Sequence, residues 1–234
     1  MFDKIIEILN TKNGIEFGGP TELFSDNRWN MPLYNFVQLD GGNLKDDNHF
    51  QKIGENFVYS NKTGKQFNVD CALDLSVIEN KRYDFIVTSH VIEHIANPIK
   101  SIRNWKKILN KDGYILSVMP DYRFCFDHNR PLTTLEHLIE DFLKDVGEDD
   151  KTHIEEQKTM HDWAYGGHKD FYSLCDINEK TRVVHHHTFD EKSFKDMMEH
   201  IGFETVISFK QDDFMSFTIV NLSSKLILSI GFKE

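Results

Sequence analysis

The chain has 234 residues, of which 39% are hydrophobic, and its formal net charge at pH 7 is -11. This length and composition support one substantial buried core, so we expect a single domain over residues 1–234. An acidic surface repels polyanions, which argues against a nucleic-acid substrate and favours a small-molecule one, although a local basic groove is compatible with this charge.

The cysteines and the apolar segments bear on location. Cys71, Cys125 and Cys175 are odd in number, and their spacing fits neither a disulfide framework nor a Cys-x-x-Cys zinc site. The amino terminus lacks the basic start and cleavage site of a signal peptide, and no uncharged apolar run approaches the roughly 20 residues of a membrane span. We therefore expect a cytoplasmic protein with reduced cysteines and no membrane partner, whose oligomeric state the sequence leaves open.

Helical and strand patterns alternate in the first half of the chain. Apolar residues at helical spacing predict a short helix before Asn13-Gly14, and Asn97-Pro98 begins a second helix that Gly113 ends. Gly41-Gly42 is predicted to turn the chain directly after Asp40. The expected buried strands cover residues 15–17, 35–39, 67–73, 83–88 and 114–119.

A long segment rich in histidine, acidic and aromatic residues follows the fifth strand. Thr133 to Glu136 offers a capping box for one helix, and a second helix is predicted over residues 152–165, ended by Gly166-Gly167. An insertion after the fifth strand sits above the carboxyl edge of the sheet. We therefore expect residues 121–188 to form a helical lid that binds the acceptor substrate. A helix over residues 193–201 and strands over 203–209 and 214–221 complete the chain.

Several stretches resemble one family. The string D-F-I-V-T-S-H-V-I-E-H-I-A-N-P from Asp84, and then L-N-K-D-G-Y-I-L-S-V-M-P from Leu109, resemble the central segment of class I S-adenosylmethionine-dependent methyltransferases. Upstream, Gly14 to Thr21 resembles the first loop of that family, in the subgroup where Gly-Gly-Pro replaces Gly-x-Gly-x-Gly. The match covers the chain up to Pro120 and resumes near His187.

The resemblance implies a fold and a cofactor. The fold would be a Rossmann-like α/β sheet of seven strands with an antiparallel last strand, helices on both faces and the lid described above. The cofactor would be S-adenosyl-L-methionine, with S-adenosyl-L-homocysteine as product. The enzyme would be an N- or O-methyltransferase.

The same resemblance assigns cofactor contacts to matching positions. The glycine turn would hold the methionine end, Asp40 would accept hydrogen bonds from the ribose hydroxyls, and Asp74 would accept from the adenine amine. Asp40 could equally be an exposed turn residue, and Asp74 could equally cap the helix that starts at Ser76. The expected cofactor-binding residues are Glu16, Gly18, Gly19, Pro20, Asp40, Asp74, Leu75, Ser89 and His90.

The acceptor site is expected just past the fifth strand. Arg123 and Arg130 could bind a phosphate or carboxylate with two parallel hydrogen bonds. Arg130 could instead anchor the lid to its own acidic residues. The expected substrate-binding residues are His94, Asp121, Tyr122, Arg123, His128 and Arg130, with help from His185, His186 and His187. A hydroxyl acceptor also needs a base, for which the candidates are His90, Tyr122, His128 and His187.

One further stretch bears on the acceptor. Asp127 to His137, D-H-x-R-P-x-T-T-x-E-H, resembles methyltransferases of bacterial surface-polysaccharide pathways. The resemblance implies a sugar, a nucleotide sugar, or a phosphorylated amine such as ethanolamine phosphate as the small-molecule acceptor.

The histidines also raise the question of a metal. Residues 185–187 are all histidine, and His161 and His168 lie nearby in sequence. No His-Glu-x-x-His string or cysteine pair accompanies them, and adjacent residues of a strand point to opposite faces. We therefore expect no metal site. Tyr165 to Lys169 matches the Tyr-x-x-x-Lys pair of short-chain dehydrogenases, but its two glycines would break the helix which that pair needs.

Two other classes of function stay open. A methyltransferase fold that has lost turnover could serve as a binding or scaffold protein, which the shortened glycine loop permits. An NAD-linked sugar oxidoreductase would bind nicotinamide and would end its sheet in a parallel strand.

Overall fold

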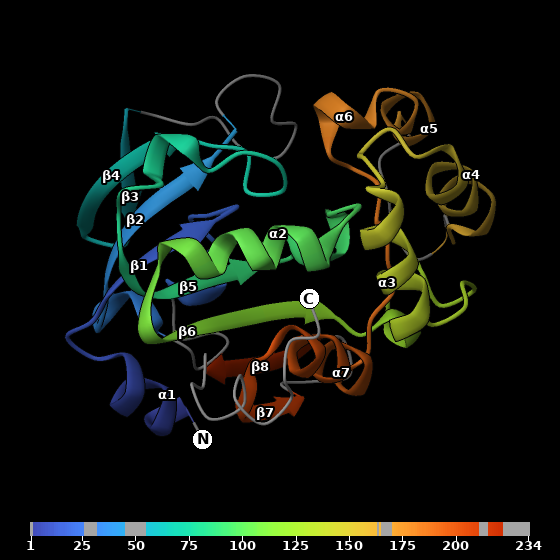
Figure 1. Cartoon of the computed structure of the whole chain (residues 1–234). Helices are drawn as coiled ribbons and strands as arrows, with labels where there is room; N and C mark the ends of the chain where they lie inside the picture. Colours follow the sequence, from blue (N-terminus) through green and yellow to red (C-terminus); the bar gives the residue numbers. More distant parts are fainter. Residues whose placement is uncertain are drawn as a thin grey trace.

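The computed structural model describes residues 2–25, 32–44, 55–162, 164, 170–210 and 215–221. In this part of the chain the strands form one eight-stranded sheet in the order β3-β4-β2-β1-β5-β6-β8-β7 (Figure 1). The strands are β1 (Asn13–Phe17), β2 (Gln38–Asn43), β3 (Asn56–Tyr59), β4 (Lys62–Asn68), β5 (Tyr83–Ser89), β6 (Leu109–Pro120), β7 (Glu204–Lys210) and β8 (Met215–Asn221).

The direction of the strands decides between two of the sequence hypotheses. β4, β2, β1, β5 and β6 are parallel neighbours, whereas β8 runs antiparallel to β6 and β7 runs antiparallel to β8. The prediction of an antiparallel last strand is confirmed, and the parallel last strand of an NAD-linked oxidoreductase is excluded. The predicted count of seven strands is wrong for the described chain, because β3 forms an additional antiparallel hairpin with β4 at the sheet edge.

Local sequence explains where the main helices start and stop. Asn97 caps α2 by accepting a hydrogen bond from the Lys100 amide, and Pro98 occupies the first turn. Asp190 caps α7, which Gly202 ends in the left-handed region at φ 96°. The helices are α1 (Phe2–Leu9), α2 (Pro98–Trp105), α3 (Leu135–Lys144), α4 (Lys151–Met160), α5 (Phe171–Cys175), α6 (Asn178–Thr181) and α7 (Glu191–Ile201). Short 3-10 turns are η1 (Glu22–Phe24), η2 (Leu33–Asn35), η3 (Ser76–Ile78), η4 (Ile92–His94), η5 (Lys106–Ile108) and η6 (Tyr122–Phe124).

The sheet has a buried core on each face. Because successive side chains of a strand point to opposite faces, Phe85 and Val87 of β5 enter one core while Ile86 enters the other. The core beside Ile86 is closed by α2 and α7, and fully buried Trp105 lies in it. The other core is closed by α1 with η1 and η2. Burial of each large apolar side chain contributes about 1.5–3 kcal/mol.

The second strand differs from its predicted position. β2 begins at Gln38 and continues through Gly41 and Gly42, which were expected to turn the chain. A Cβ on Gly41 would lie 2.1 Å from the Phe57 ring, and one on Gly42 would lie 2.7 Å from the Phe17 ring. Both glycines therefore permit close packing inside the strand rather than a turn, and Asp40 lies in the interior of β2 instead of at its end.

The third predicted strand is also displaced. β4 covers Lys62–Asn68, whereas the sequence pattern predicted a strand over residues 67–73. The Asp70 carboxylate accepts hydrogen bonds from the amides of Ala72 and Leu73 and so closes a tight turn. This turn places residues 71 and 72 beyond the carboxyl end of β4.

Residues 121–188, which we call the helical insertion, contain α3 to α6. Figure 1 shows these helices gathered beyond the end of the sheet to which the arrows of β5 and β6 point. The insertion is joined to the segment between β5 and α2 by a hydrogen bond from the His187 amide to the Glu93 carbonyl (3.3 Å) and one from Asn97 Nδ2 to the Asp141 carbonyl (3.0 Å). The predicted second helix of this segment stops at Met160, and Gly166-Gly167 lies outside the described residues. Among the helices of the described ranges, none has both the length and the apolar character to cross a membrane.

Candidate functional site

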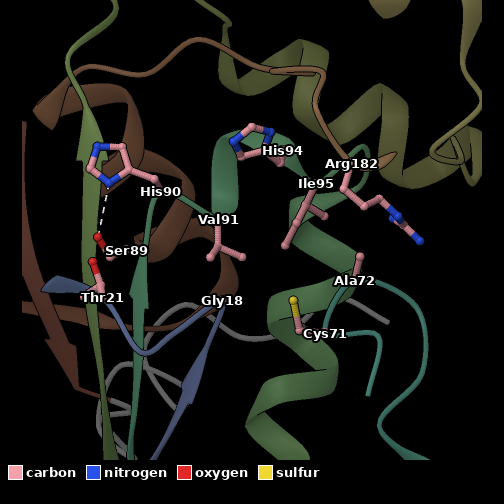
Figure 2. Close-up of a pocket in the computed structure, with 10 residues that line it drawn as sticks. All are labelled: Gly18, Thr21, Cys71, Ala72, Ser89, His90, Val91, His94, Ile95 and Arg182. Atoms are coloured by element: carbon pink, nitrogen blue, oxygen red, sulfur yellow. Dashed lines mark hydrogen bonds between the residues drawn. The ribbon is translucent and has the colours of Figure 1, made fainter. Parts of the chain in front are cut away.

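A pocket of about 300 Å³ lies at the carboxyl edge of the sheet. Figure 2 shows that it is enclosed by the loop after β1, the turn after β4, the segment after β5, and one residue of the helical insertion. In open α/β sheets this edge is where ligands bind. The lining residues are Gly18, Thr21, Cys71, Ala72, Ser89, His90, Val91, His94, Ile95 and Arg182.

The loop after β1 depends on glycine. Gly18 has φ +79°, a conformation that other residues adopt only with strain, and a Cβ there would lie 2.4 Å from Cγ2 of Val91. A Cβ on Gly19 would lie 2.1 Å from Cδ of Glu16. The loop backbone can therefore approach both its own support and a ligand more closely than a loop with side chains could.

Glu16 holds this loop in place through hydrogen bonds. Its side chain is fully buried, Oε1 accepts a hydrogen bond from the Thr21 amide (3.1 Å), and Oε2 accepts one from the Tyr34 hydroxyl (2.7 Å). Burial raises the pKa of Glu16 to about 8, although both hydrogen bonds oppose the shift. The carboxyl group is therefore mostly neutral at pH 7, and Glu16 acts as a positioning residue for the loop.

His90 faces the pocket in an unusual backbone conformation. Its φ is +53°, which is rare for residues other than glycine, and its Nδ1 lies 3.1 Å from the Ser89 hydroxyl. Solvent reaches the ring through the pocket, yet the surrounding protein, and then His185, lower the pKa of His90 to about 4. The ring is neutral at pH 7 and therefore does not repel a cationic ligand.

His94, Glu93 and His185 form a second group beside the pocket, which we call the proton cluster. Each residue offers one nitrogen or carboxylate oxygen, and these atoms lie within 4.8 Å of one another. His94 Nδ1 donates to the Val184 carbonyl (3.2 Å), so the neutral ring carries its lone pair on Nε2. Burial lowers the pKa of His94 well below its usual value and raises the pKa of Glu93 to about 7.

Asp127 orients the proton cluster. His185 Nδ1 donates a 2.6 Å hydrogen bond to Oδ2 of Asp127. Burial of Asp127 favours its neutral form, but His185 and Arg130 outweigh burial and lower the pKa of this carboxyl below its usual range. The ionised carboxylate fixes the orientation of the His185 ring through this hydrogen bond.

Arg182 ties the helical insertion to the pocket wall. Its Nη2 pairs with Oδ2 of Asp70 at 2.5 Å, and its Nη1 pairs with Oε1 of Glu148 at 3.0 Å. Glu148 is buried and also accepts a hydrogen bond from the Ala96 amide. The pair with Asp70 links residues that are 112 positions apart in the sequence.

Asp40 does not reach this pocket, which corrects its predicted contact with the ribose. Its carboxylate accepts hydrogen bonds from the Tyr83 hydroxyl (2.9 Å) and the Lys65 amide (2.9 Å). It lines a different cavity together with Asn13, the first residue of β1. The residue that ends β2 is Asn43, whose Nδ2 donates to the Gly19 carbonyl at 2.8 Å and so supports the glycine loop.

Asp74 and Leu75 also fall outside the lining residues. Asp74 is exposed and accepts a hydrogen bond from the Ser76 amide (2.8 Å), which is the helix-capping alternative. Leu75 packs against the core. The lining residues from this part of the chain are Cys71 and Ala72, which precede Leu75 in the sequence.

The two arginines predicted to bind an anion are paired within the chain. Arg123 forms two hydrogen bonds with buried Asp121, at 2.8 Å through Nε and 2.5 Å through Nη2. Arg130 is 3% exposed, and its hydrogen bonds all go to the insertion itself. Its partners are Asp127, Glu156, Gln157 and the carbonyl oxygens of His185 and His186. The alternative that Arg130 anchors the insertion is therefore correct.

Three of the four predicted bases lie outside the pocket lining. His128 Nδ1 donates to the Cys125 carbonyl (2.9 Å), and its Nε2 lies 3.2 Å from Asp162. His187 is 1% exposed and packs among other histidines of the insertion rather than against the pocket. Tyr122 is half-buried after β6 and is not a lining residue. Only His90 of this set faces the pocket.

Several lining residues were not predicted from the sequence. Thr21 and Val91 adjoin predicted positions, and Ile95 directly follows the predicted His94. Arg182 had no local signal, because its role depends on Asp70 and Glu148 from other parts of the chain. The free thiols of Cys71, Cys125 and Cys175 agree with the expectation of unpaired cysteines.

The sequence matches a family described as a methyltransferase domain over residues 3–208. The chain belongs to this methyltransferase family. No curated protein matches the sequence. Among solved structures, an S-adenosylmethionine-dependent methyltransferase from Mesorhizobium loti shares the fold, with TM-score 0.51 and 9% identity over 94% of this chain and 95% of that chain.

Two more distant structures are similar over part of their length. The CurJ carbon methyltransferase gives TM-score 0.45 and 11% identity, covering 92% of this methyltransferase and 49% of that chain. Human N-acetylserotonin methyltransferase, solved in complex with S-adenosylmethionine, has TM-score 0.47 and 10% sequence identity. The match covers 95% of this chain and 52% of that chain. The chain thus spans about half the length of these two proteins.

S-adenosylmethionine is the cofactor of this methyltransferase, and the pocket residues fit it. The loop at Gly18 has a cradle that a Cβ would fill. Cys71, Ala72, Val91 and Ile95 offer an apolar wall for a flat ring. His90 is neutral, and the lining cation Arg182 is paired with two carboxylates, so the lining presents no unbalanced positive charge to a sulfonium.

Proposed function

We propose that this methyltransferase transfers a methyl group to a nitrogen or oxygen of a small polar acceptor that enters beside His90 and His94. The observation that carries the proposal is the placement of two neutral histidines and the glycine loop around one pocket. When bound, the cofactor supplies a methyl group on a sulfonium, which an acceptor lone pair can displace in line. Such a reaction needs chiefly alignment and exclusion of water, which can lower the barrier by about 7–11 kcal/mol.

The protein groups have separate tasks in this reaction. Gly18 and its support by Glu16 fix the backbone against the methionine end, and the apolar wall at Ala72 and Val91 holds the adenine end. His90 and His94 orient the acceptor through their ring nitrogens. The helical insertion acts as a lid that keeps water out, with Arg182 holding it against the turn after β4.

A hydroxyl acceptor must also lose a proton. His94 carries its lone pair on Nε2 and can accept this proton directly. Glu93 lies behind it in the proton cluster, and its pKa of about 7 suits a group that exchanges protons near neutral pH. We therefore assign proton acceptance to His94 backed by Glu93, with His185 and Asp127 orienting them. An amine acceptor needs only a free lone pair.

The acceptor class follows from charge and from the resemblance at Asp127 to His137. We infer a phosphorylated amine such as ethanolamine phosphate, or a sugar or nucleotide sugar, used in bacterial surface-glycan synthesis. Arg123 and Arg130 are paired with acidic residues of the insertion, and Arg182 is paired with Asp70 beside the pocket. The amine or hydroxyl end therefore enters the pocket, and any phosphate stays towards solvent.

Mass spectrometry tests this proposal. The full chain is incubated with isotope-labelled S-adenosylmethionine and separate amines, phosphorylated amines, sugars and nucleotide sugars. The expected result is a gain of labelled methyl on one of these classes. Methylation of none of them, with binding of S-adenosylhomocysteine, would overturn the acceptor class.

A non-catalytic binding or scaffold protein is the second candidate, and the shortened glycine loop favours it. Calorimetry with S-adenosylhomocysteine separates the two. Binding in the micromolar range together with turnover supports the enzyme, whereas absence of both supports the scaffold.

A further inference from the structure

The helical insertion contains a cluster of three histidines and one aspartate that the proposed reaction does not use. His137 and Asp141 lie one turn apart on α3, His153 comes from α4, and His187 comes from the extended segment before α7. Each offers one nitrogen or oxygen atom, and the four atoms lie within 4.8 Å of one another. We call these four residues the histidine-aspartate cluster.

The distances in the cluster match those between the ligands of a tetrahedral ion. His137 Nε2 lies 3.0 Å from His153 Nε2 and 3.2 Å from Asp141 Oδ2. The same Asp141 oxygen lies 3.7 Å from His153 Nε2 and 3.8 Å from His187 Nε2. Zinc bound at about 2.0–2.1 Å from each ligand separates adjacent tetrahedral ligand atoms by about 3.3–3.4 Å. The four distances bracket this value.

One proposed ligand atom of the cluster is buried without a hydrogen-bond partner. It is Oδ2 of Asp141, in a residue that is 5% exposed. A buried carboxylate oxygen without a hydrogen bond costs free energy. An ion at the centre of the cluster would satisfy the Asp141 oxygen.

The orientation of His153 is fixed from outside the cluster. Its Nδ1 lies 3.1 Å from Nδ1 of His186, and Nε2 of His186 lies 3.3 Å from Oε2 of Glu148. The same His186 Nε2 accepts a 2.9 Å hydrogen bond from Asn178 Nδ2, so both rings are held in place and Nε2 of His153 faces the cluster. Metal-binding histidines are commonly held through their second ring nitrogen.

Ligand chemistry and access agree with a cation. The cluster combines three imidazoles with one carboxylate, which are the ligand types of a nitrogen-rich zinc site. The side chain of His137 is 46% exposed, which leaves a route from solvent to the cluster.

We propose that His137, Asp141, His153 and His187 bind one zinc ion that joins α3, α4 and the segment before α7. Nitrogen-rich four-coordinate sites suit zinc, whereas magnesium and calcium prefer six or more oxygens. His187 Nε2 donates a hydrogen bond to the Ala96 carbonyl at 3.1 Å. Zinc binding at this nitrogen would replace that hydrogen bond. The role is structural, because the cluster lies outside the pocket lining.

This site replaces the sequence-based expectation of no metal. The three consecutive histidines contact different neighbours: His185 belongs to the proton cluster, His186 contacts His153, and His187 belongs to the histidine-aspartate cluster. The ligands come from three separate elements, and only the spacing of His137 and Asp141 on one helix is a local signal. The inference is independent of the proposed acceptor.

The test measures metal content and the response of stability to zinc. Full-length protein without an affinity tag is treated with chelator, dialysed, and titrated with zinc alone. We expect one zinc ion per chain by elemental analysis and a rise in melting temperature with zinc. Cobalt in place of zinc should give the intense visible absorption of tetrahedral nitrogen and oxygen coordination.

Variants assign the ion to the cluster. Asp141→Asn and His153→Gln should lose the zinc and the thermal shift, while His161→Gln should keep both. His161 is a matched control, since it is a buried histidine of the same insertion that packs against Phe126 and Phe171 outside the cluster. His137→Gln should weaken zinc binding at least tenfold without changing the melting temperature in chelator, because His137 is exposed.

Two results would overturn the proposal. One is a wild-type protein that binds no zinc and shows no thermal shift, which would make the cluster a hydrogen-bonded histidine network. The other is equal zinc content in His137→Gln, His161→Gln and the wild type. If Asp141→Asn does not fold, the His137→Gln result alone decides.

Discussion

The Tyr34 hydroxyl donates a 2.7 Å hydrogen bond to Oε2 of Glu16, a carboxyl group with no exposed surface. Tyr34 in turn accepts a hydrogen bond from the Thr21 amide (2.7 Å), and Glu16 Oε1 accepts from the same amide. The two side chains therefore hold the loop that contains Gly18 at its far end. Since burial raises the pKa of Glu16 to about 8, this support works mainly in the uncharged state.

Glu16→Gln should change the pH dependence of stability. The pKa of Glu16 is about 8 in the folded chain against 4.5 for an ordinary glutamate, so its stabilising contribution is full below about pH 4.5 and is lost as pH rises through about 8. Glutamine cannot ionise. The melting temperature of the variant, relative to wild type, should therefore rise between about pH 5 and about pH 9. The rise should be about 2–4 °C for each 1 kcal/mol of unfolding free energy that the wild type loses as Glu16 ionises.

Differential scanning at several pH values measures this effect. Glu93 also has a raised pKa, but it is present in both proteins and so cancels in the difference. A difference in melting temperature that stays constant across the range would show that Glu16 is ionised in the folded chain.

Gly18→Ala should weaken cofactor binding. Alanine at φ +79° is strained, and its Cβ would meet Val91, so the loop must move. Strain of this kind costs about 1–3 kcal/mol. We expect the affinity for S-adenosylhomocysteine to fall at least about tenfold by calorimetry, while the circular dichroism spectrum is kept. Gly18→Ala combined with Val91→Ala removes the clash but not the strain, and should recover part of the affinity. Unchanged affinity in the single variant would place the cofactor elsewhere.

Local patterns were sufficient to predict the central part of the fold. β5 and residues 114–119 of β6 are largely apolar, and α7 has both a capping residue and a terminal glycine, so their sequences indicate them directly. The start of α2 was also predicted from Asn97 and Pro98, but the helix ends at Trp105 and not at Gly113, which lies within β6. Gly18, Ser89 and His90 line the pocket because they lie at the carboxyl ends of β1 and β5, which their sequence positions indicated.

Interactions between distant residues were beyond local patterns. Gly41 and Gly42 have the sequence of a turn, but the rings of Phe57 and Phe17 require glycine inside β2, and Asp40 was misplaced as a result. Arg130 has the sequence of an anion-binding residue, but five partners from the folded insertion take up its donors. Such pairing depends on tertiary structure that no short motif contains.

Arg182→Met should destabilise the chain. The change keeps much of the side-chain volume but leaves the buried Glu148 carboxylate and Asp70 without their cation. Loss of one partner of a buried ion pair costs about 3 kcal/mol. We expect a lower denaturant midpoint in urea unfolding. Lys192→Met removes an exposed ion pair with Asp196 and should leave the midpoint unchanged. Equal midpoints for the two variants would contradict the structural role of Arg182.

Glu93→Gln should separate proton transfer from cofactor binding. The pKa of Glu93 is raised to about 7 by burial, so the wild-type kcat/KM with a hydroxyl acceptor should fall as pH drops through about 7 and Glu93 becomes protonated. Glutamine cannot accept the proton, so kcat should fall about 10²–10⁴-fold and this acidic limb should disappear. The affinity for S-adenosylhomocysteine should stay within about threefold.

His128→Gln provides the matched comparison for Glu93→Gln. Both ring nitrogens of His128 face partners within the insertion, the Cys125 carbonyl and Asp162, so its replacement should leave the acidic limb in place and kcat within about threefold. If His128→Gln abolished the limb and Glu93→Gln kept it, the base would lie in the insertion, as the sequence pattern suggested. If both variants kept it, the acceptor would be an amine that reacts through a free lone pair, because such an acceptor needs no protein base.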